Sequence, residues 1–128
     1  MEVVETVRDT WAGPLAVRLL VDDRSPGGLE PDEGVEMALA LVRAGVDLIA
    51  PSAGHTIPSA APDYRRLALL ALADRIRNEG GVPVLVGGGI TTLDDIDTFV
   101  VAGRADLGVL DPTLVLRPVT VGELVSNR

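Results

Sequence analysis

Residues 82–92, read as Val-Pro-Val-Leu-Val-Gly-Gly-Gly-Ile-Thr-Thr, place a short apolar run directly before three consecutive glycines. An apolar run of about five residues that ends in glycine is typical of a buried strand. Thr92, followed by Asp95, resembles a capping box, which predicts that a helix begins just after the turn. The stretch therefore predicts a strand, a tight glycine turn and a helix in immediate succession.

The same succession extends along the rest of the chain. Strands are expected at 15–21, 47–51, 82–86 and 105–110. Amphipathic helices are expected over the opening residues up to Gly13-Pro14, over 31–44, over 63–79 and from 92 to about 103, with a short last helix over 118–128. Strands that alternate with helices in this way pair in parallel through right-handed crossovers, which predicts an α/β fold.

A short internal repeat indicates a fold built from duplicated units. The segment 44–48 (AGVDL) returns, with one residue inserted, as 102–107 (AGRADL), each time at a predicted helix-to-strand joint. Such repetition suits a barrel of βα pairs better than an irregular open sheet. A complete eight-stranded barrel needs about 250 residues. We therefore expect the 128 residues to form a single half-barrel domain, with four parallel strands of a TIM (βα)8 barrel.

Composition and charge exclude several classes of function. A formal net charge of −8, without a Lys/Arg cluster that includes aromatic residues, would repel nucleic acid. With no Cys and one His, the chain has no disulfide, no thiolate nucleophile and too few ligands for an ordinary zinc site, so no metal is predicted. No apolar run reaches the roughly 20 residues that cross a bilayer, and the acidic opening does not resemble a signal peptide. We expect a cytoplasmic protein that binds neither nucleic acid nor membrane.

The glycine turn is the most informative of the predicted strand ends, where ligands gather in parallel α/β folds. Gly87, Gly88 and Gly89 remove Cβ obstruction and let backbone N–H groups converge beside a helix N-terminus. These features are those of a phosphate cradle. A tight turn that needs glycine only for its backbone angles explains the spacing equally well.

Other polar residues near the strand ends carry weaker signals. Arg18 lies inside an apolar strand, where a guanidinium must be paired with an anion or a polar ligand edge, so a binding role is favoured. His55 has the chemistry of an acid or base, but a solvated loop histidine is the more common case. Asp22 and Asp23 are interpreted as the polar end of a strand. No catalytic residue is assigned.

Four segments follow one another with the order and spacing of a known family. They are 14–23 (PLAVRLLVDD), 27–54 (GGLEPDEGVEMALALVRAGVDLIAPSAG), 72–92 (LADRIRNEGGVPVLVGGGITT) and 102–118 (AGRADLGVLDPTLVLRP). Together they resemble the C-terminal half of the Old Yellow Enzyme family of NAD(P)H:flavin oxidoreductases. Within that family they are most similar to the barrel module of bifunctional salicylyl-CoA and anthraniloyl-CoA hydroxylases.

The resemblance implies that the chain supplies barrel strands five to eight of an FMN-linked oxidoreductase that takes hydride from NAD(P)H. The family's arginine in the VRL segment, which contacts the pyrimidine edge of FMN, matches Arg18. The family's glycine turn after strand seven, which binds the FMN phosphate, matches Gly88 and Gly89. The family's substrate-binding pair and tyrosine proton donor belong to strands one to four. The chain would thus contribute the flavin site without the substrate acid and base.

The predicted fourth strand departs from the family pattern. Asp111-Pro112 stands where family members carry a Gly-Arg pair that helps to hold the FMN phosphate. An anion replaces a cation, and the proline removes a backbone donor. At an effective dielectric near 20, a carboxylate about 5 Å from a phosphate charge costs on the order of 3 kcal/mol. We therefore expect Asp111 to weaken FMN binding.

A half-barrel has unsatisfied surfaces that predict a partner. Four strands leave two open sheet edges and an inner face that a full barrel would bury. Either a second copy of the chain or a separate N-terminal half-barrel would satisfy them, so a homo-oligomer or such a complex is expected, with a small-molecule substrate if the assembly is an enzyme.

The residues leave two other functions open. Asp111-Pro112 favours a degenerate, non-catalytic half-barrel that acts as a scaffold or dimerisation module. The glycine turn is equally compatible with a half-barrel that binds another phosphate ligand, such as a sugar phosphate or a nucleotide.

Overall fold

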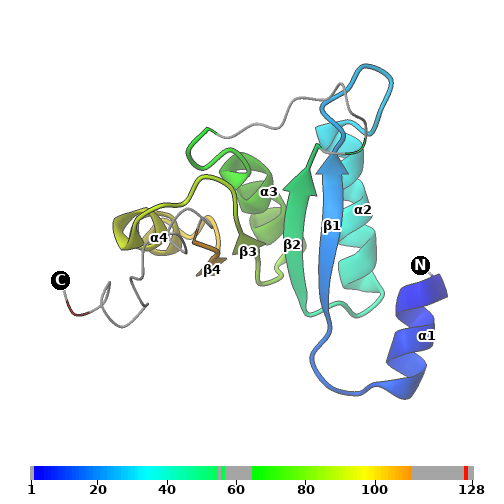
Figure 1. Cartoon of the computed structure of the whole chain (residues 1–128). Coiled ribbons are helices and arrows are strands. Elements are labelled where there is room, and N and C mark those ends of the chain that lie inside the picture. The colour runs from blue at the N-terminus through cyan, green and yellow to red at the C-terminus, as the bar shows by residue number, and fades with distance from the viewer. Residues whose placement is uncertain (1, 55, 57–64, 111–125, 127–128) are drawn as a thin grey trace.

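The structure is a computed structural model that describes residues 2–54, 56, 65–110 and 126. Its elements alternate between helix and strand (Figure 1). They are α1 (Glu2–Thr10), β1 (Ala16–Asp22), α2 (Pro31–Arg43), β2 (Leu48–Ala53), α3 (Leu70–Gly80), β3 (Leu85–Val86), α4 (Leu93–Val101) and β4 (Leu107–Gly108). None of the described helices is long and apolar enough to span a membrane. The described elements are of the α/β class, with short parallel strand pairs.

The strands run parallel in chain order. β1 pairs with β2, and β3 pairs with β4, as two short parallel sheets. A single parallel bridge between Ile49 and Val84 links β2 to β3. Val17 pairs with Ile49, and Val86 pairs with Gly108. Because paired residues of parallel strands point to the same side, these five residues share one face.

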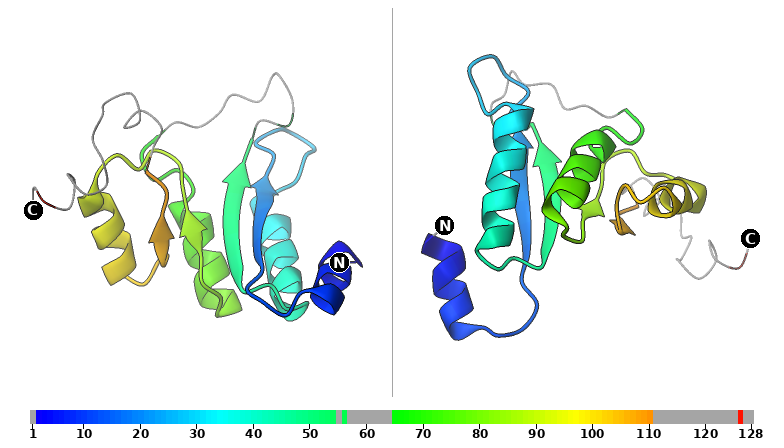
Figure 2. Two further views of the ribbon diagram at one scale, coloured as in Figure 1. Left: turned by 60° about the horizontal axis from the view of Figure 1, so that its bottom comes forward. Right: turned by 180° about the vertical axis from the view of Figure 1, so that it is seen from behind.

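That face carries the hydrophobic core. Helices α2, α3 and α4 lie on this side of the strands (Figure 2). α2 approaches β1 so closely that a Cβ at Gly34 would lie 2.0 Å from the carbonyl oxygen of Val21. At β4, the last strand, the absence of a side chain at Gly108 leaves room for Ile96 and Phe99 of α4. Fully buried core side chains include Val21, Val35, Ile49, Ile76, Val84, Val86, Ile90 and Phe99.

The opposite face of the strands, called the open face below, is covered by no described helix (Figure 2). It is formed by the alternate strand residues Ala16, Arg18, Leu20, Ala50, Ser52, Leu85 and Leu107, together with Val109 just beyond β4. Leu107 and Val109 have relative exposures of 50% and 48%. A contiguous exposed apolar patch is a feature of surfaces that bind a partner or a ligand.

Local sequence signals explain where two helices begin. Pro31 occupies the first turn of α2, where its missing N–H costs nothing, and Asp32 and Glu33 follow at the positive end of the helix dipole. The capping box predicted for Thr92 and Asp95 is confirmed at the start of α4.

The helix predicted over 63–79 was wrong at its N-terminal end. α3 begins only at Leu70, and the preceding described residues form turns. Leu67 has a φ of +58°, a left-handed conformation that a helix cannot contain. Its side chain still packs against the core. The apolar spacing was therefore produced by a turn that folds Leu67 inward, and not by a helical face.

Three other expectations differ from the structure. The third and fourth strands are shorter than predicted, with two residues each in the regular ladder. In the opening helix Val4 is buried in the core, but Val3 and, just beyond α1, Trp11 are 76% and 54% exposed, so only part of the predicted amphipathic face packs against the core. The helix predicted over 118–128 lies outside the described residues apart from Ser126.

An arginine and an aspartate join α1 to the start of β2. The Arg8 guanidinium donates to the Gly45 carbonyl oxygen at 2.7 Å and forms an ion pair with Asp47. Asp47 also accepts the Leu15 backbone N–H at 2.8 Å. The hydrogen bond from Leu15 and that from Arg8 hold the pKa of Asp47 below its ordinary value. We call this arrangement the first clamp.

The second clamp repeats these contacts between α3 and β4. Arg77 donates to both carboxylate oxygens of Asp106, at 3.0 and 3.1 Å, and to the Gly103 carbonyl oxygen at 2.9 Å. Asp106 also accepts the Val84 backbone N–H at 2.9 Å. Burial acts to raise the pKa of Asp106, but the hydrogen bonds from Arg77 and Val84 and the Arg77 charge outweigh it, so the net pKa is lowered.

The two clamps show that the short sequence repeat belongs to a longer structural one. Residues 7–17 (VRDTWAGPLAV) and 76–86 (IRNEGGVPVLV) align without a gap, with the clamp arginine, the proline and the strand residue in equivalent places. The ends of α2 and α4 also correspond: Val46 donates to Leu41 at 3.1 Å, as Arg104 donates to Phe99 at 2.9 Å. The described chain therefore contains two copies of an α-β-α-β unit.

The second clamp makes a testable contribution to stability. Asp106→Asn keeps the size of the side chain but removes the charge that Arg77 binds, and it should lower the free energy of unfolding by about 1–2 kcal/mol in urea titrations at neutral pH. Because the pKa of Asp106 is lowered in the folded state, the difference from the parent should shrink as the pH falls below about 4. Asp9→Asn on α1 is the control. An Asp106→Asn protein as stable as this control would contradict the role of the clamp.

Candidate ligand site at the glycine turn

The polar residues at the end of β1 shape their own loop. Asp22 accepts the Arg24 backbone N–H at 2.7 Å, and Asp23 accepts the Leu29 backbone N–H at 2.7 Å. The Gly54 N–H donates to the Asp22 carbonyl oxygen at 2.8 Å, which joins the ends of β1 and β2. These contacts account for both carboxylates structurally, in agreement with their interpretation as the polar end of a strand.

The glycine turn after β3 needs glycine for two different reasons. Gly88 and Gly89 have φ values of +94° and +66°, which L-residues with a side chain rarely adopt. At Gly89 a Cβ would also lie 2.7 Å from the Arg65 carbonyl oxygen, so the passing chain fills the space of a side chain. Gly87 has neither restriction. Its φ is not positive, and a Cβ placed on it would lie 3.6 Å from the nearest atom, which belongs to Val109. Part of the motif is therefore required by folding alone.

The turn nevertheless presents unused donors. The backbone N–H groups of Gly88 and Gly89 donate no hydrogen bond to any residue in the described part of the chain. Gly88 is exposed, and the nearest atom to a Cβ placed there would be 3.7 Å away, on Leu69. Two adjacent backbone N–H groups without an acceptor in a turn are potential donors to an anion.

The N-terminus of α4 is not available to an anion in the way the sequence suggested. Asp95 accepts the backbone N–H groups of Thr91 and Thr92, both at 3.3 Å, while the Thr92 hydroxyl accepts the Asp95 N–H at 3.1 Å. The helix thus supplies its own carboxylate to its first donors. The N–H groups of Thr91, Thr92 and Asp95 thus have acceptors within the helix start, whereas those of Gly88 and Gly89 have none among the described residues.

Arg66 is a residue whose position sequence reasoning missed. It falls within the helix predicted over 63–79, but it lies in the turn before α3 and donates to Asp95 at 2.7 Å. Asp95 is fully buried, whereas the Arg66 side chain is 69% exposed. The hydrogen bond from Arg66 outweighs burial and keeps the pKa of Asp95 low. Nothing in the local pattern signalled this pair, because it joins residues 29 positions apart.

Arg18 does not have the buried position predicted for it. Its side chain is exposed on the open face of β1, because no described element covers that face. It makes no hydrogen bond or ion pair with another described residue. The expected burial of the guanidinium is therefore not observed, whereas its pairing with a ligand remains a prediction.

The strand register fixes how Arg18 and the turn are spaced. Arg18 pairs with Ala50, one residue beyond the Ile49–Val84 bridge, so it lies level with Leu85 of β3. Gly88 follows three residues later. With strands about 4.8 Å apart and a rise of about 3.3 Å per residue, the two Cα atoms are separated by roughly 10 Å across the strands and roughly 10 Å along them. Only an elongated ligand could contact both.

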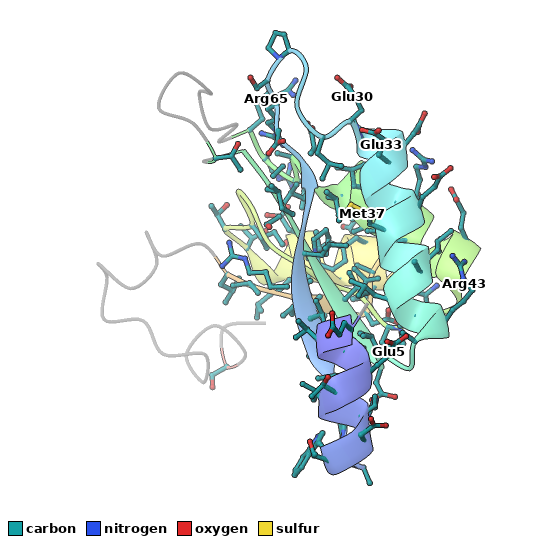
Figure 3. All side chains as sticks on the ribbon, turned by 90° about the vertical axis from the view of Figure 1, so that its right-hand side faces the viewer. Glu5, Glu30, Glu33, Met37, Arg43 and Arg65 are labelled. Carbon is teal, nitrogen blue, oxygen red and sulfur yellow. The ribbon has the colours of Figure 1, made fainter. Side chains whose placement is uncertain are left out.

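The remaining predicted site residues cannot be compared with the structure. Asp111 and Pro112, expected opposite the glycine turn, lie outside the described residues, as does His55. Arg65, which precedes Arg66, lies at the end of the molecule where the strands finish (Figure 3).

A glycine series tests the two reasons for the turn. Gly89→Ala should lower the free energy of unfolding by more than about 2 kcal/mol, since it combines a positive φ with a backbone collision. Gly88→Ala should cost about 1 kcal/mol, from the φ alone, and Gly87→Ala should stay within about 0.5 kcal/mol of the parent. The measurement is equilibrium unfolding in urea. Equal effects at all three positions would contradict this assignment.

Comparison with known proteins found relatives that are named NADPH dehydrogenase. The chain is 34% identical over 117 residues to an NADPH dehydrogenase of Geobacillus thermodenitrificans, which covers 91% of this chain and 34% of the relative. An NADPH dehydrogenase of Geobacillus sp. strain WCH70 is 33% identical over 120 residues, with the same coverage of both chains. That of Bacillus licheniformis is 34% identical over 109 residues, covering 83% of this chain and 31% of the relative. No protein-family model matches. The chain is thus similar over most of its length to NADPH dehydrogenases, and it spans about a third of the length of these relatives.

Proposed function

We propose that this chain is the strand-five-to-eight half of an Old Yellow Enzyme-like (βα)8 barrel and forms the FMN site of an NADPH-linked oxidoreductase. Its similarity to proteins named NADPH dehydrogenase over 91% of its residues supports this assignment. Parallel strands in chain order, with α2 to α4 on one side, are compatible with one half of such a barrel.

The observation that carries the proposal is that two separate sets of hydrogen-bond donors are unused. The Gly88 and Gly89 N–H groups have no acceptor among the described residues, and Arg18 has no partner there either. They belong to strands two positions apart, and Arg18 projects from the open face. FMN carries a phosphate at one end and a flat ring with hydrogen-bond acceptors at the other, and so requires two separated sets of donors.

These residues fit the two ends of FMN. Gly88 and Gly89 would hold the phosphate through backbone N–H groups, where the lack of a Cβ allows close approach. Arg18 would donate to the acceptor edge of the ring, and its permanent charge would stabilise negative charge there. The Arg66–Asp95 pair supports the site indirectly, because it neutralises a buried carboxylate that would otherwise repel the phosphate.

The chain's residues would bind and orient the cofactor and leave the substrate to other groups. When bound, FMN supplies hydride transfer from NADPH to an acceptor. No described residue is assigned as an acid or base for the substrate. The proposal therefore limits this chain to the flavin half of the active site.

Flavin titration tests the proposal. FMN should bind to the chain and quench flavin fluorescence, and Arg18→Ala should weaken its binding about tenfold or more, since a hydrogen bond to a charged group contributes about 1.5–3 kcal/mol. Arg43→Ala, at the end of α2 on the far side of the strands (Figure 3), is the matched control and should bind as the parent does.

Inorganic phosphate separates this function from the nearest alternative. It should compete with FMN for the parent, and its own affinity should be unchanged in Arg18→Ala. If Arg18→Ala and Arg43→Ala bind FMN equally while phosphate still competes, the turn serves a different phosphate ligand. A chain that fails to bind FMN at millimolar concentration would overturn the flavin site.

A further inference from the structure

The exposed apolar side chains gather at the two ends of the row of strands. At one end, α1 and the segment after it expose Val3 and Trp11. At the other end, α4 exposes Val100 and Val101, at 40% and 88%, next to Leu107 and Val109. Among the described large hydrophobic residues with high exposure, only Met37 on α2 lies elsewhere. Each end therefore has an apolar surface without a described neighbour.

The internal repeat shows what these two ends lack. α1 is equivalent to α3, but α3 buries Leu70, Ala73 and Ile76, whereas α1 buries only Val4. Val4 aligns with Ala73, and the half-buried Val7 aligns with Ile76. The extra burial of α3 comes from its position against α2, on the other side of the β2–β3 bridge. α1 has no helix in the corresponding place among the described residues.

Equivalent residues lie close together at the existing junction. Trp11 aligns with Gly80 of α3, and Val100 aligns with Val42 of α2. A Cβ at Gly80 would lie 2.9 Å from a methyl group of Leu39 and 3.9 Å from one of Val42, both on α2. If the β4–α4 end met a β1–α1 end in the same way, Val100 would meet Trp11. The Trp11 indole already lies against Gly13 and leaves its other side exposed.

We propose that the chain forms a closed homodimer in which the β4–α4 end of each copy packs against the β1–α1 end of the other. Each new junction repeats the β2–β3 junction within the chain. Two such contacts close around a twofold axis, give eight parallel strands and leave neither sheet edge free. The proposal uses the half-barrel arrangement proposed above, but it does not depend on flavin binding.

The mass of the native chain in solution tests the proposal. Light scattering after gel filtration, without flavin, should give twice the chain mass of 13.4 kDa. Val100→Glu should shift the protein to the monomer, because it places a carboxylate where the junction is apolar. Met37→Glu, on α2 and away from the two ends of the row of strands (Figure 3), is the control and should remain dimeric. A parent protein that is monomeric, or that forms a ladder of longer assemblies, would overturn the closed dimer.

Engineered cysteines test the contact between Trp11 and Val100 directly, and they do not depend on whether Val100→Glu folds. The chain has no native cysteine, so Trp11→Cys combined with Val100→Cys introduces the only two thiols. Mild oxidation should convert this variant to a covalent dimer, whereas Trp11→Cys combined with Met37→Cys should stay largely monomeric on a denaturing gel. Equal cross-linking of the two variants, or none in the first, would overturn the junction. Because both readouts omit FMN, they succeed or fail independently of the flavin site.

Discussion

The clamp between a helix arginine and a strand-start aspartate is the interaction on which the rest of the fold depends. It occurs twice, as Arg8 with Asp47 and as Arg77 with Asp106. Each aspartate also accepts a backbone N–H at or just before the neighbouring strand, so one carboxylate fixes a helix and two strands relative to each other. In strands as short as β3 and β4, the regular ladder alone offers few hydrogen bonds, and this additional link determines their register.

Both clamps lie where strands begin, whereas the glycine turn lies where a strand ends. This separation allows the two ends to meet different requirements. At the start of the strands, the clamp arginines and aspartates all have hydrogen-bond partners. At the end of β3, the N–H groups of Gly88 and Gly89 have no acceptor among the described residues. In parallel α/β folds, stability commonly depends on residues at the amino ends of the strands, and ligands bind at the carboxyl ends. Both clamps lie at the amino ends of their strands, in agreement with this division.

Local signals in the sequence were sufficient for the parts of the fold that depend on neighbouring residues. The capping box of Thr92 and Asp95 and the proline at the start of α2 were both predictable, because each acts within one helical turn. The start of α3 was not, because Leu67 satisfies an apolar spacing from a left-handed turn. Helical periodicity cannot distinguish a residue that points inward from a helix from one that points inward from a turn.

The candidate site was predictable in its residues but not in its environment. The glycines were identified by their place after a strand, but the chain that passes at Arg65, which makes Gly89 obligatory, is distant in sequence. Burial of Arg18 was inferred from its apolar neighbours, on the assumption that both faces of β1 are covered. The described chain covers one face only, and Arg18 is exposed on the other.

Backbone and arginine side-chain NMR during titration with FMN tests the two-ended flavin site most directly. FMN should shift the amide signals of Gly88 and Gly89 and the guanidinium signal of Arg18 together, along one saturation curve. Inorganic phosphate should shift the two glycine amides and leave Arg18 unchanged. Shifts confined to Thr91 and Thr92 at the start of α4, or an Arg18 signal that never responds to FMN, would contradict the proposed site.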